Sequence, residues 1–342
     1  MGFKSINYVA SMGFATLKAK LLRKPQILTA QIMLNYTCNA HCQYCSAPHS
    51  RDVMAFEKVQ EILEILKRHG TLQVSYAGGE PTIHPQYESI MALSREMGYF
   101  ITVSSNGLDP RPILSSPKNK RPHVVSISLD GPAELHDIYR GYGSWKKAWS
   151  TLEELKKYNI ARTINAVIGK NNCRIENLQW LLKTAIGLKA SVGFQFMLPR
   201  YDAEDKENPL AANHAQRQML LKSLLSLSSW EKQRLIFDDS ILKQLLTWEE
   251  SFPYYRNVVN KICYAGRYFI FIRPDGIAAP CSLLEEHPWY KENYITGENF
   301  EEALKRVQRI PCNDCYLGCN LLRNKLLSLR GSAVKRIWSF FT

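Results

Sequence analysis

Eight of the nine cysteines of this chain fall into two groups, one near each end. The first group is Cys38, Cys42 and Cys45, three thiols within eight residues. Three thiolates on one loop can hold three corners of a cubane iron–sulfur cluster and leave the fourth iron open. A structural zinc site normally closes with four ligands, and His41 or His49 could supply the fourth here. The ninth cysteine, Cys173, stands alone, and we expect it to have no ligand role.

The second group combines a predicted hairpin with a cysteine-rich segment. Cys263 and Cys281 flank the sequence RYFIFIRPDGIAAP, which reads as two strands around a Pro-Asp-Gly turn. A hairpin brings its two ends together, so these thiolates can share one site with Cys312 and Cys315 of the segment PCNDCYLGC. Four thiolates make a closed site, for zinc or for a [4Fe–4S] cluster. Cys319 is then surplus and could replace one of the four.

The elements around the first group alternate between strands and helices. We expect strands within 26–37, 72–77, 99–104, 123–129, 161–168 and 191–197, and helices at 55–68, 86–97, 145–157 and 175–188. Such alternation predicts a parallel sheet with helices outside it. Polar and glycine residues follow several strands, at the sheet edge where barrel-type folds bind ligands.

The motif C-x3-C-x2-C, with Tyr44 before its third cysteine, resembles the signature of the radical S-adenosylmethionine (radical SAM) enzymes. That resemblance implies a partial, six-stranded (β/α)6 TIM barrel. It also implies a [4Fe–4S] cluster whose open iron binds the amino and carboxylate groups of SAM. Reductive cleavage of SAM then gives a 5′-deoxyadenosyl radical that abstracts hydrogen from a substrate. The electron donor would be a reductant such as flavodoxin or ferredoxin.

The same resemblance implies the residues that bind SAM. Gly78-Gly79-Glu80-Pro81 looks like the motif that receives the SAM amino group, with the glycines letting the backbone approach the ligand. Arg140 is the candidate partner of the SAM carboxylate, because a guanidinium suits a carboxylate. The other expected contacts end later strands: Ser105, Asn106, Ser128 and Asp130. No catalytic acid or base is identified.

The C-x12-G-x4-C opening at Cys263 resembles the auxiliary-cluster appendage of radical SAM enzymes, called SPASM or, in its shorter form, Twitch. It implies one auxiliary [4Fe–4S] cluster on Cys263, Cys281, Cys312 and Cys315, with Cys319 as the alternative fourth ligand. We therefore expect a barrel at 26–235 and a helical connection plus SPASM/Twitch-like domain at 236–322. The terminal segments 1–25 and 323–342 flank them.

Ten basic residues and no acidic residue lie in residues 1–24 and 323–342, whereas the net charge of the whole chain is +13. Both ends are also apolar at helical spacing, the second with Trp338, Phe340 and Phe341. Basic amphipathic segments can lie on anionic membranes. We expect a cytoplasmic protein with no nucleic-acid partner, and peripheral attachment to the inner face of the membrane is the alternative.

The sequence leaves the substrate open among peptide, small molecule and lipid or isoprenoid. Only about 25 residues precede the first expected strand, so the separate peptide-binding region that peptide maturases often carry is not visible, which disfavours a peptide. The basic ends favour a lipid. A zinc-binding interaction module is the non-enzymatic alternative, but it leaves the Gly-Gly-Glu-Pro motif and the alternation of strands and helices unexplained.

Overall fold

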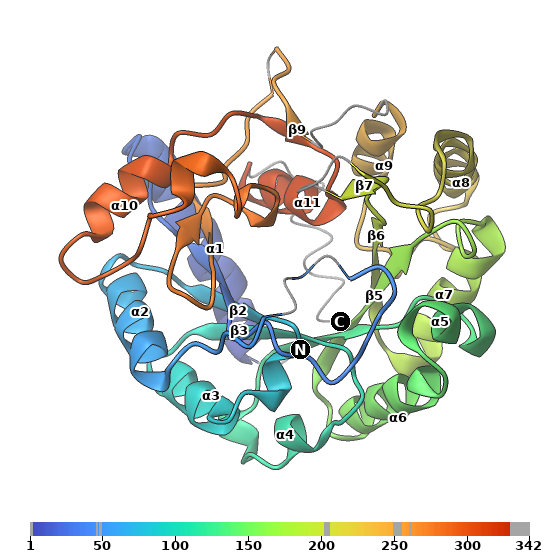
Figure 1. Ribbon diagram of the computed structural model, residues 1–342, viewed down its shortest axis with the longest axis horizontal. Coiled ribbons are helices and arrows are strands. Elements are labelled where there is room, and N and C mark those ends of the chain that lie inside the picture. The colour runs from blue at the N-terminus through green and yellow to red at the C-terminus, as the bar shows by residue number, and fades with distance from the viewer. Residues whose placement is uncertain are drawn as a thin grey trace.

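The computed structural model describes residues 3–45, 47, 50–201, 206–248, 255–259 and 261–328. Its centre is one eight-stranded sheet in the order β11-β10-β1-β2-β3-β4-β5-β6, curved into a partial barrel (Figure 1). Strands β1 to β6 run parallel to one another. The predicted partial (β/α)6 barrel is therefore confirmed.

All six predicted barrel strands form. Their bounds are β1 Thr29–Met33, β2 Gln73–Ala77, β3 Phe100–Ser105, β4 Val124–Ser128, β5 Ala161–Ile168 and β6 Ser191–Phe196. The predicted hairpin forms as well, from β10 (Phe269–Ile272) and β11 (Ala278–Ala279), which pair antiparallel. The sequence did not predict that β10 joins the barrel sheet, pairing parallel with β1.

Helices cover the outside of the sheet. The four predicted barrel helices are confirmed as α2 Phe56–Arg68, α3 Tyr87–Glu96, α6 Ser144–Lys157 and α7 Ile175–Leu188 (Figure 1). Besides α1 and α11, the other helices and strands are α4 Arg111–Leu114, α5 Ala133–Arg140, α8 His214–Ser226, α9 Asp239–Leu246, α10 Phe300–Val307, β7 Arg200–Tyr201, β8 Lys206–Glu207, β9 Tyr255–Arg256 and β12 Asp314–Cys315.

The two faces of the strands differ in chemistry. Residues that face the helices are apolar and fully buried, such as Val74, Ile101 and Val125, and they form the core. Many residues that face the barrel interior are partly buried or exposed. Eleven of these are neutral polar residues: Thr29, Gln31, Gln73, Ser75, Thr102, Ser104, Ser126, Ser128, Thr163, Asn165 and Gln195. The interior is therefore a hydrogen-bonding surface.

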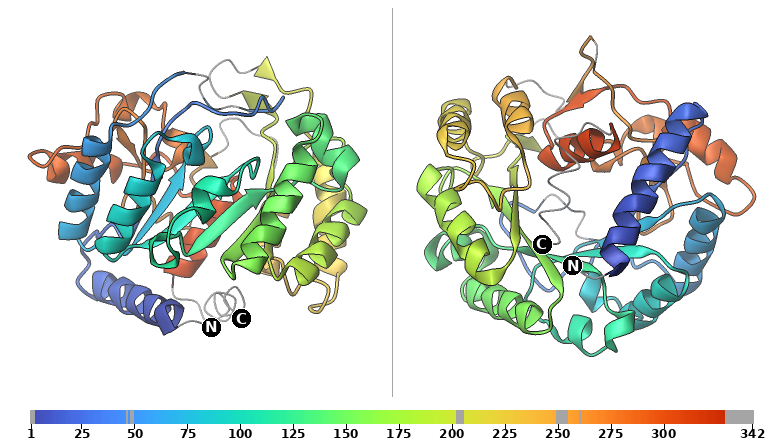
Figure 2. Two further views of the ribbon diagram at one scale, coloured as in Figure 1. Left: turned by 90° about the horizontal axis from the view of Figure 1, so that it is seen from below. Right: turned by 180° about the vertical axis from the view of Figure 1, so that it is seen from behind.

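Two further helices close the barrel. Helix α1 (Phe3–Leu21) lies across the amino-terminal ends of the strands (Figure 2). There the Tyr8 hydroxyl donates to the side-chain oxygen of Gln73 at 2.5 Å. Helix α11 (Gly318–Leu327) lies at the gap between the sheet edges, where Arg323 donates to the side-chain oxygen of Gln31 at 2.8 Å.

Among the described residues, none of the helices is both long and apolar enough to span a bilayer. The aromatic residues Trp338, Phe340 and Phe341, expected to contact a membrane, lie outside the described residues. The proposed domain boundaries stay a prediction. The pairing of β10 with β1 shows that the segment 236–322 shares a sheet with the barrel.

Candidate functional site

The first cysteine group opens onto a cavity of about 190 Å³ at the carboxyl edge of the sheet. Cys38, Cys42 and Cys45 lie on the loop that follows β1. The cavity is lined by residues from four successive loops: Tyr36, Cys38, Ala40, Cys42, Tyr44, Cys45, Ala47, Ala77, Gly78, Gly79, Ser104, Ser105, Asn106, Ser128 and Arg140. Nine of the twelve predicted SAM-cluster and SAM-binding positions therefore line one cavity, and the other three, Glu80, Pro81 and Asp130, do not.

Gly78 and Gly79 are needed for packing between loops. A Cβ atom on Gly78 would lie 2.5 Å from the carbonyl oxygen of Asn35. A Cβ atom on Gly79 would lie 2.5 Å from the carbonyl oxygen of Tyr36. The loop after β2 thus rests directly on the backbone that leads to Cys38. The sequence predicts that these glycines let the backbone approach the ligand. The structure shows in addition that a side chain at either position would clash with the cysteine loop.

Glu80 is 1% exposed and does not line the cavity. Its carboxylate accepts the backbone N–H of Asn106 at 2.7 Å and the Thr82 hydroxyl at 2.7 Å. Burial raises the pKa of Glu80, and these hydrogen bonds oppose that rise. Glu80 therefore holds the loop after β3 against the loop after β2. Pro81 is buried at the start of the helical turn Pro81–Ile83 and also lies off the cavity.

Asn106 connects the loop after β3 to the cysteine loop. Its side-chain amide donates to the side-chain oxygen of Asn39 at 2.7 Å and to the Cys38 sulfur at 3.7 Å. A donor beside a thiolate stabilises the negative charge on sulfur. The placement of Asn106 fits its predicted role at the site and adds a contact to a cysteine that the sequence did not suggest.

Asp130 is fully buried, and it supports Arg140. Its carboxylate accepts the Arg140 guanidinium at 2.6 and 3.2 Å and the Tyr44 hydroxyl at 3.2 Å. Burial alone would lower the pKa of Arg140, but the Asp130 carboxylate raises it well above its usual range. Arg140 is therefore a fixed cation on the cavity wall, suited to an anionic group such as a carboxylate.

Burial raises the pKa of the Cys38 and Cys42 thiols, and Arg140 opposes the rise at Cys42. Thiols of this kind become thiolates when a metal centre replaces the proton. The donor set is three sulfurs beside an open cavity, which fits a cluster with one iron free of protein ligands. Among the described residues, no three His, Cys, Asp or Glu side chains are arranged to hold a single metal ion, so the fit to a cluster rests on the three sulfurs and the cavity that they share.

The second cysteine group surrounds a narrow space of its own. Cys263, Cys281, Cys312 and Cys315 all line it, together with Tyr255, Asp314 and Asn324. Cys319 does not line it and is exposed. Burial raises the pKa of Cys312 to about 12 and that of Cys281 and Cys315 well above the usual range. This donor set fits a four-thiolate cofactor, with Cys319 as the surplus thiol.

Two residues that the sequence analysis missed support this second site. Asp314 is buried between Cys312 and Cys315, and its carboxylate accepts Lys261 at 2.7 Å and Arg256 at 3.0 Å. Asn324 of α11 donates to the Cys263 sulfur at 3.5 Å. In the sequence, only the position of Asp314 between two clustered cysteines pointed to a role at this site. That position does not show that Lys261 and Arg256 would be its partners.

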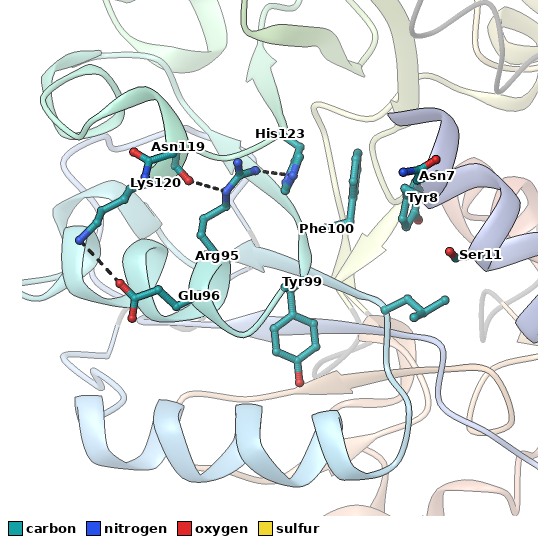
Figure 3. A pocket seen from close by; sticks show the side chains of 12 residues that line it. Asn7, Tyr8, Ser11, Arg95, Glu96, Tyr99, Phe100, Asn119, Lys120 and His123 are labelled. Atoms are coloured by element: carbon teal, nitrogen blue, oxygen red, sulfur yellow. Dashed lines mark hydrogen bonds and ion pairs between the residues drawn. The ribbon is translucent and has the colours of Figure 1, made fainter. Parts of the chain in front are cut away.

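A larger groove of about 550 Å³ lies at the other end of the barrel, between α1 and the loops that precede β3 and β4 (Figure 3). None of the cysteines lines it. Its charged side chains are already paired, since Lys120 faces Glu96 at 3.7 Å and Arg95 donates to the Asn119 carbonyl at 2.8 Å. We therefore place the chemistry in the smaller cavity beside the cysteine loop.

Comparison with protein families identifies the barrel. Residues 32–179 match the model of the Radical SAM superfamily. Mycofactocin maturase MftC of Mycobacterium ulcerans (strain Agy99) is 26% identical over 280 residues, covering 80% of this chain and 73% of that protein. The antilisterial bacteriocin subtilosin biosynthesis protein AlbA of Bacillus subtilis (strain 168) is 25% identical over 297 residues, covering 84% of this chain and 60% of AlbA.

Solved structures share the fold. Streptococcus suis SuiB bound to the precursor peptide SuiA superposes with a TM-score of 0.59 at 17% identity, covering 86% of this chain and 68% of SuiB. The enzyme anSMEcpe with bound AdoMet and the Cp18Cys peptide superposes with a TM-score of 0.61 at 21% identity, covering 84% of this chain and 81% of that chain.

Proposed function

This chain is a radical SAM enzyme, and we propose that it modifies a peptide. The observation that favours a peptide substrate is the neutral polar lining of the barrel interior. Its amide and hydroxyl groups can form hydrogen bonds with a peptide backbone. The named relatives support the proposal, because MftC is a maturase and AlbA takes part in bacteriocin biosynthesis. The alternative, a lipid or isoprenoid, would cover exposed polar side chains of the interior, such as Ser104 and Asn165, without forming hydrogen bonds to them, which is costly.

We propose that Cys38, Cys42 and Cys45 hold a [4Fe–4S] cluster and that SAM occupies the cavity beside them. When bound, the cluster and SAM supply a 5′-deoxyadenosyl radical that abstracts a substrate hydrogen. Arg140, held by Asp130, would bind the SAM carboxylate, while the backbone at Gly78 and Gly79 and the side chains of Ser105, Asn106 and Ser128 line its place. Glu80 and Asp130 act as positioning residues.

We further propose that Cys263, Cys281, Cys312 and Cys315 hold an auxiliary [4Fe–4S] cluster. The support is that all four thiols line one buried space and that Cys319 does not. Asp314 would keep the segment between Cys312 and Cys315 in place through Arg256 and Lys261. Zinc is the competing occupant, because four-cysteine zinc sites are common.

Anaerobic reconstitution tests the cofactors. We expect about eight irons per chain, a brown protein, and cleavage of SAM by a strong reductant. Cys42→Ala should abolish SAM cleavage, because its sulfur holds an iron of the SAM-binding cluster. Cys173→Ala is the matched control, since Cys173 is a buried thiol outside both sites, and it should keep both iron and activity. A colourless protein holding zinc would refute both cluster assignments.

The substrate class needs a separate experiment. We would incubate the reconstituted enzyme, SAM and reductant with a precursor peptide encoded beside the gene and, in parallel, with isoprenoid and hopanoid extracts. We expect a change in mass of the peptide together with 5′-deoxyadenosine. Modification of the lipid fraction alone would overturn the peptide proposal and leave the cluster assignments standing.

A further inference from the structure

Helix α1 has one face that nothing in the described structure covers. The side chains of Phe14, Leu17 and Leu21 on the helix and of Leu22 directly after it are 70%, 48%, 74% and 57% exposed, and we call them the α1 stripe. On the opposite side of the helix, Thr16 and Ala19 are buried against the barrel. Large apolar side chains gathered on one exposed helix face usually mark a contact surface.

The charged residues that neighbour the α1 stripe in the sequence are all basic. Residues 1–24 contain five basic residues and no acidic residue. Of these, Lys18, Arg23 and Lys24 are exposed beside the stripe. An apolar face flanked by lysine and arginine is the pattern of helices that lie in the plane of an anionic membrane.

The α1 stripe also belongs to a larger basic end of the molecule. Tyr8 of α1 contacts the first residue of β2 through its hydroxyl and stacks on Phe100, the first residue of β3, at 3.9 Å. The last turns of the barrel helices lie at this same end of the molecule. They carry basic residues at Lys67, Arg68, Arg95, Lys156 and Lys157. Figure 3 shows Arg95 and Lys120 across the groove from α1, with the acidic residue Glu96 beside Lys120.

The opposite end of the barrel differs in charge and carries the cysteine loop. The first turns of α2, α3 and α7 contain the acidic residues Glu57, Glu88 and Glu176, whereas the first turn of α6 contains none. Basic last turns and acidic first turns compensate helix dipoles in any barrel. The α1 end should therefore attract an anionic surface more strongly than the end with the cysteine loop, although Lys146 and Lys147 near the start of α6 lie at that second end.

We propose that the α1 stripe docks this enzyme on an anionic membrane with the mouth of the barrel facing away from the bilayer. A nucleic acid would use the basic residues but not Phe14, Leu17 and Leu21, so the stripe favours lipid. With the barrel mouth facing away from the bilayer, attachment to the membrane does not require that the substrate be a lipid. A membrane-bound enzyme of this geometry still takes a polar substrate from the aqueous side, since its cavity lies at the carboxyl ends of the strands, away from α1.

Vesicle flotation of the reconstituted full chain tests the proposal. We expect binding to phosphatidylcholine vesicles that contain phosphatidylglycerol, no binding to pure phosphatidylcholine, and release by salt. The variant F14S/L17S/L21S should bind at least about tenfold more weakly, because it loses the apolar contact. A matched control is M219S/W230S, which removes two large apolar side chains that are 64% and 71% exposed on and after α8. Both variants should keep their iron and their SAM cleavage.

Several outcomes would overturn the proposal. Absence of binding to anionic vesicles at low salt, or unchanged binding by F14S/L17S/L21S, would show that the stripe does not contact lipid. A wild-type dimer that becomes monomeric in that variant would assign the stripe to a second copy of the chain. If a chain ending at Ser328 floats and the full chain does not, residues 329–342 cover the stripe and the proposal fails for the intact protein.

Discussion

At the residue scale, His136 links the stability of the site to pH. Its Nδ1 accepts the backbone N–H of Asp130 at 3.1 Å, while Nε2 is buried without a partner among the described residues. Burial lowers the pKa of His136 to about 4, although Asp130 and Asp137 act in the opposite direction. The folded protein therefore keeps this ring neutral at a pH where the unfolded chain already protonates it.

The direction of the effect follows from linkage. Between pH 7 and pH 5 the unfolded state takes up a proton at His136 and the folded state does not, so the free energy of unfolding should fall by about 2 kcal/mol from this residue. Urea unfolding of wild type and His136→Asn at both pH values isolates the contribution. We expect the variant to be less stable at pH 7 and to lose less between the two values. Equal losses in the two proteins would contradict the prediction.

Sequence spacing predicts which cysteines line a common space, but it does not predict which side chains their neighbours contact. Cysteine spacing is local, so the two groups could be recognised without a fold. Glu80 and Asp130 were expected to contact SAM, whereas each has its carboxylate occupied by groups of the protein, Asn106 and Arg140 respectively. Those partners lie 26 and 10 residues away, and only the folded chain decides whether a carboxylate meets a ligand or another residue.

At the element scale, the loop after β2 depends on the absence of a side chain at Gly79. The backbone N–H of Gly79 donates to the Asn35 carbonyl at 2.9 Å, so the two loops are bound to each other at this point. A methyl group would meet the carbonyl oxygens of Tyr36 and Thr37, which belong to the backbone before Cys38. Gly79→Ala should therefore displace the cysteine loop, lower the free energy of unfolding by about 1–3 kcal/mol and reduce SAM cleavage at least about tenfold.

Gly187→Ala is the matched control for that prediction. Gly187 lies in the last turn of α7, and a Cβ atom there would have no neighbour within 4 Å. Alanine in a helix is favoured over glycine by roughly 0.5–1 kcal/mol, so this variant should be slightly more stable and fully active. Chemical unfolding and 5′-deoxyadenosine formation check both variants. Full activity in Gly79→Ala would show that the loops do not need this close contact.

The elements of the barrel were predictable because each strand and helix repeats one short pattern. The position of β10 was not, because its four residues FIFI carry no sign of which strand they will join. Buried on both faces, they suit a central strand of a parallel sheet as well as a separate hairpin. In the structure β10 is a strand of the barrel sheet, since Phe269 pairs with Thr29 and Ile272 with Ile32.

At the scale of the whole molecule, the shared sheet places the two cysteine groups at opposite ends of neighbouring strands. Cys38 follows the carboxyl end of β1, and Cys263 precedes the amino end of β10, which runs parallel to β1. Helix α11 then joins the two regions, because Asn324 contacts Cys263 and Arg323 contacts Gln31 in the barrel interior. An auxiliary cofactor would therefore stabilise the wall that closes the barrel.

The combined variant C312A/C315A tests this arrangement. We expect its iron content to fall from about eight toward four per chain, since both sulfurs line the second site. Its melting temperature should also fall, because β10, β11 and α11 lose their common attachment, while SAM cleavage in the absence of substrate should persist at the first site. Cys319→Ala is the control, because Cys319 lies outside that space and should keep all the iron. If Cys319→Ala lost iron and C312A/C315A kept all its iron, the ligand assignment would be reversed. If the melting temperature of C312A/C315A were unchanged, the second site would not stabilise the barrel.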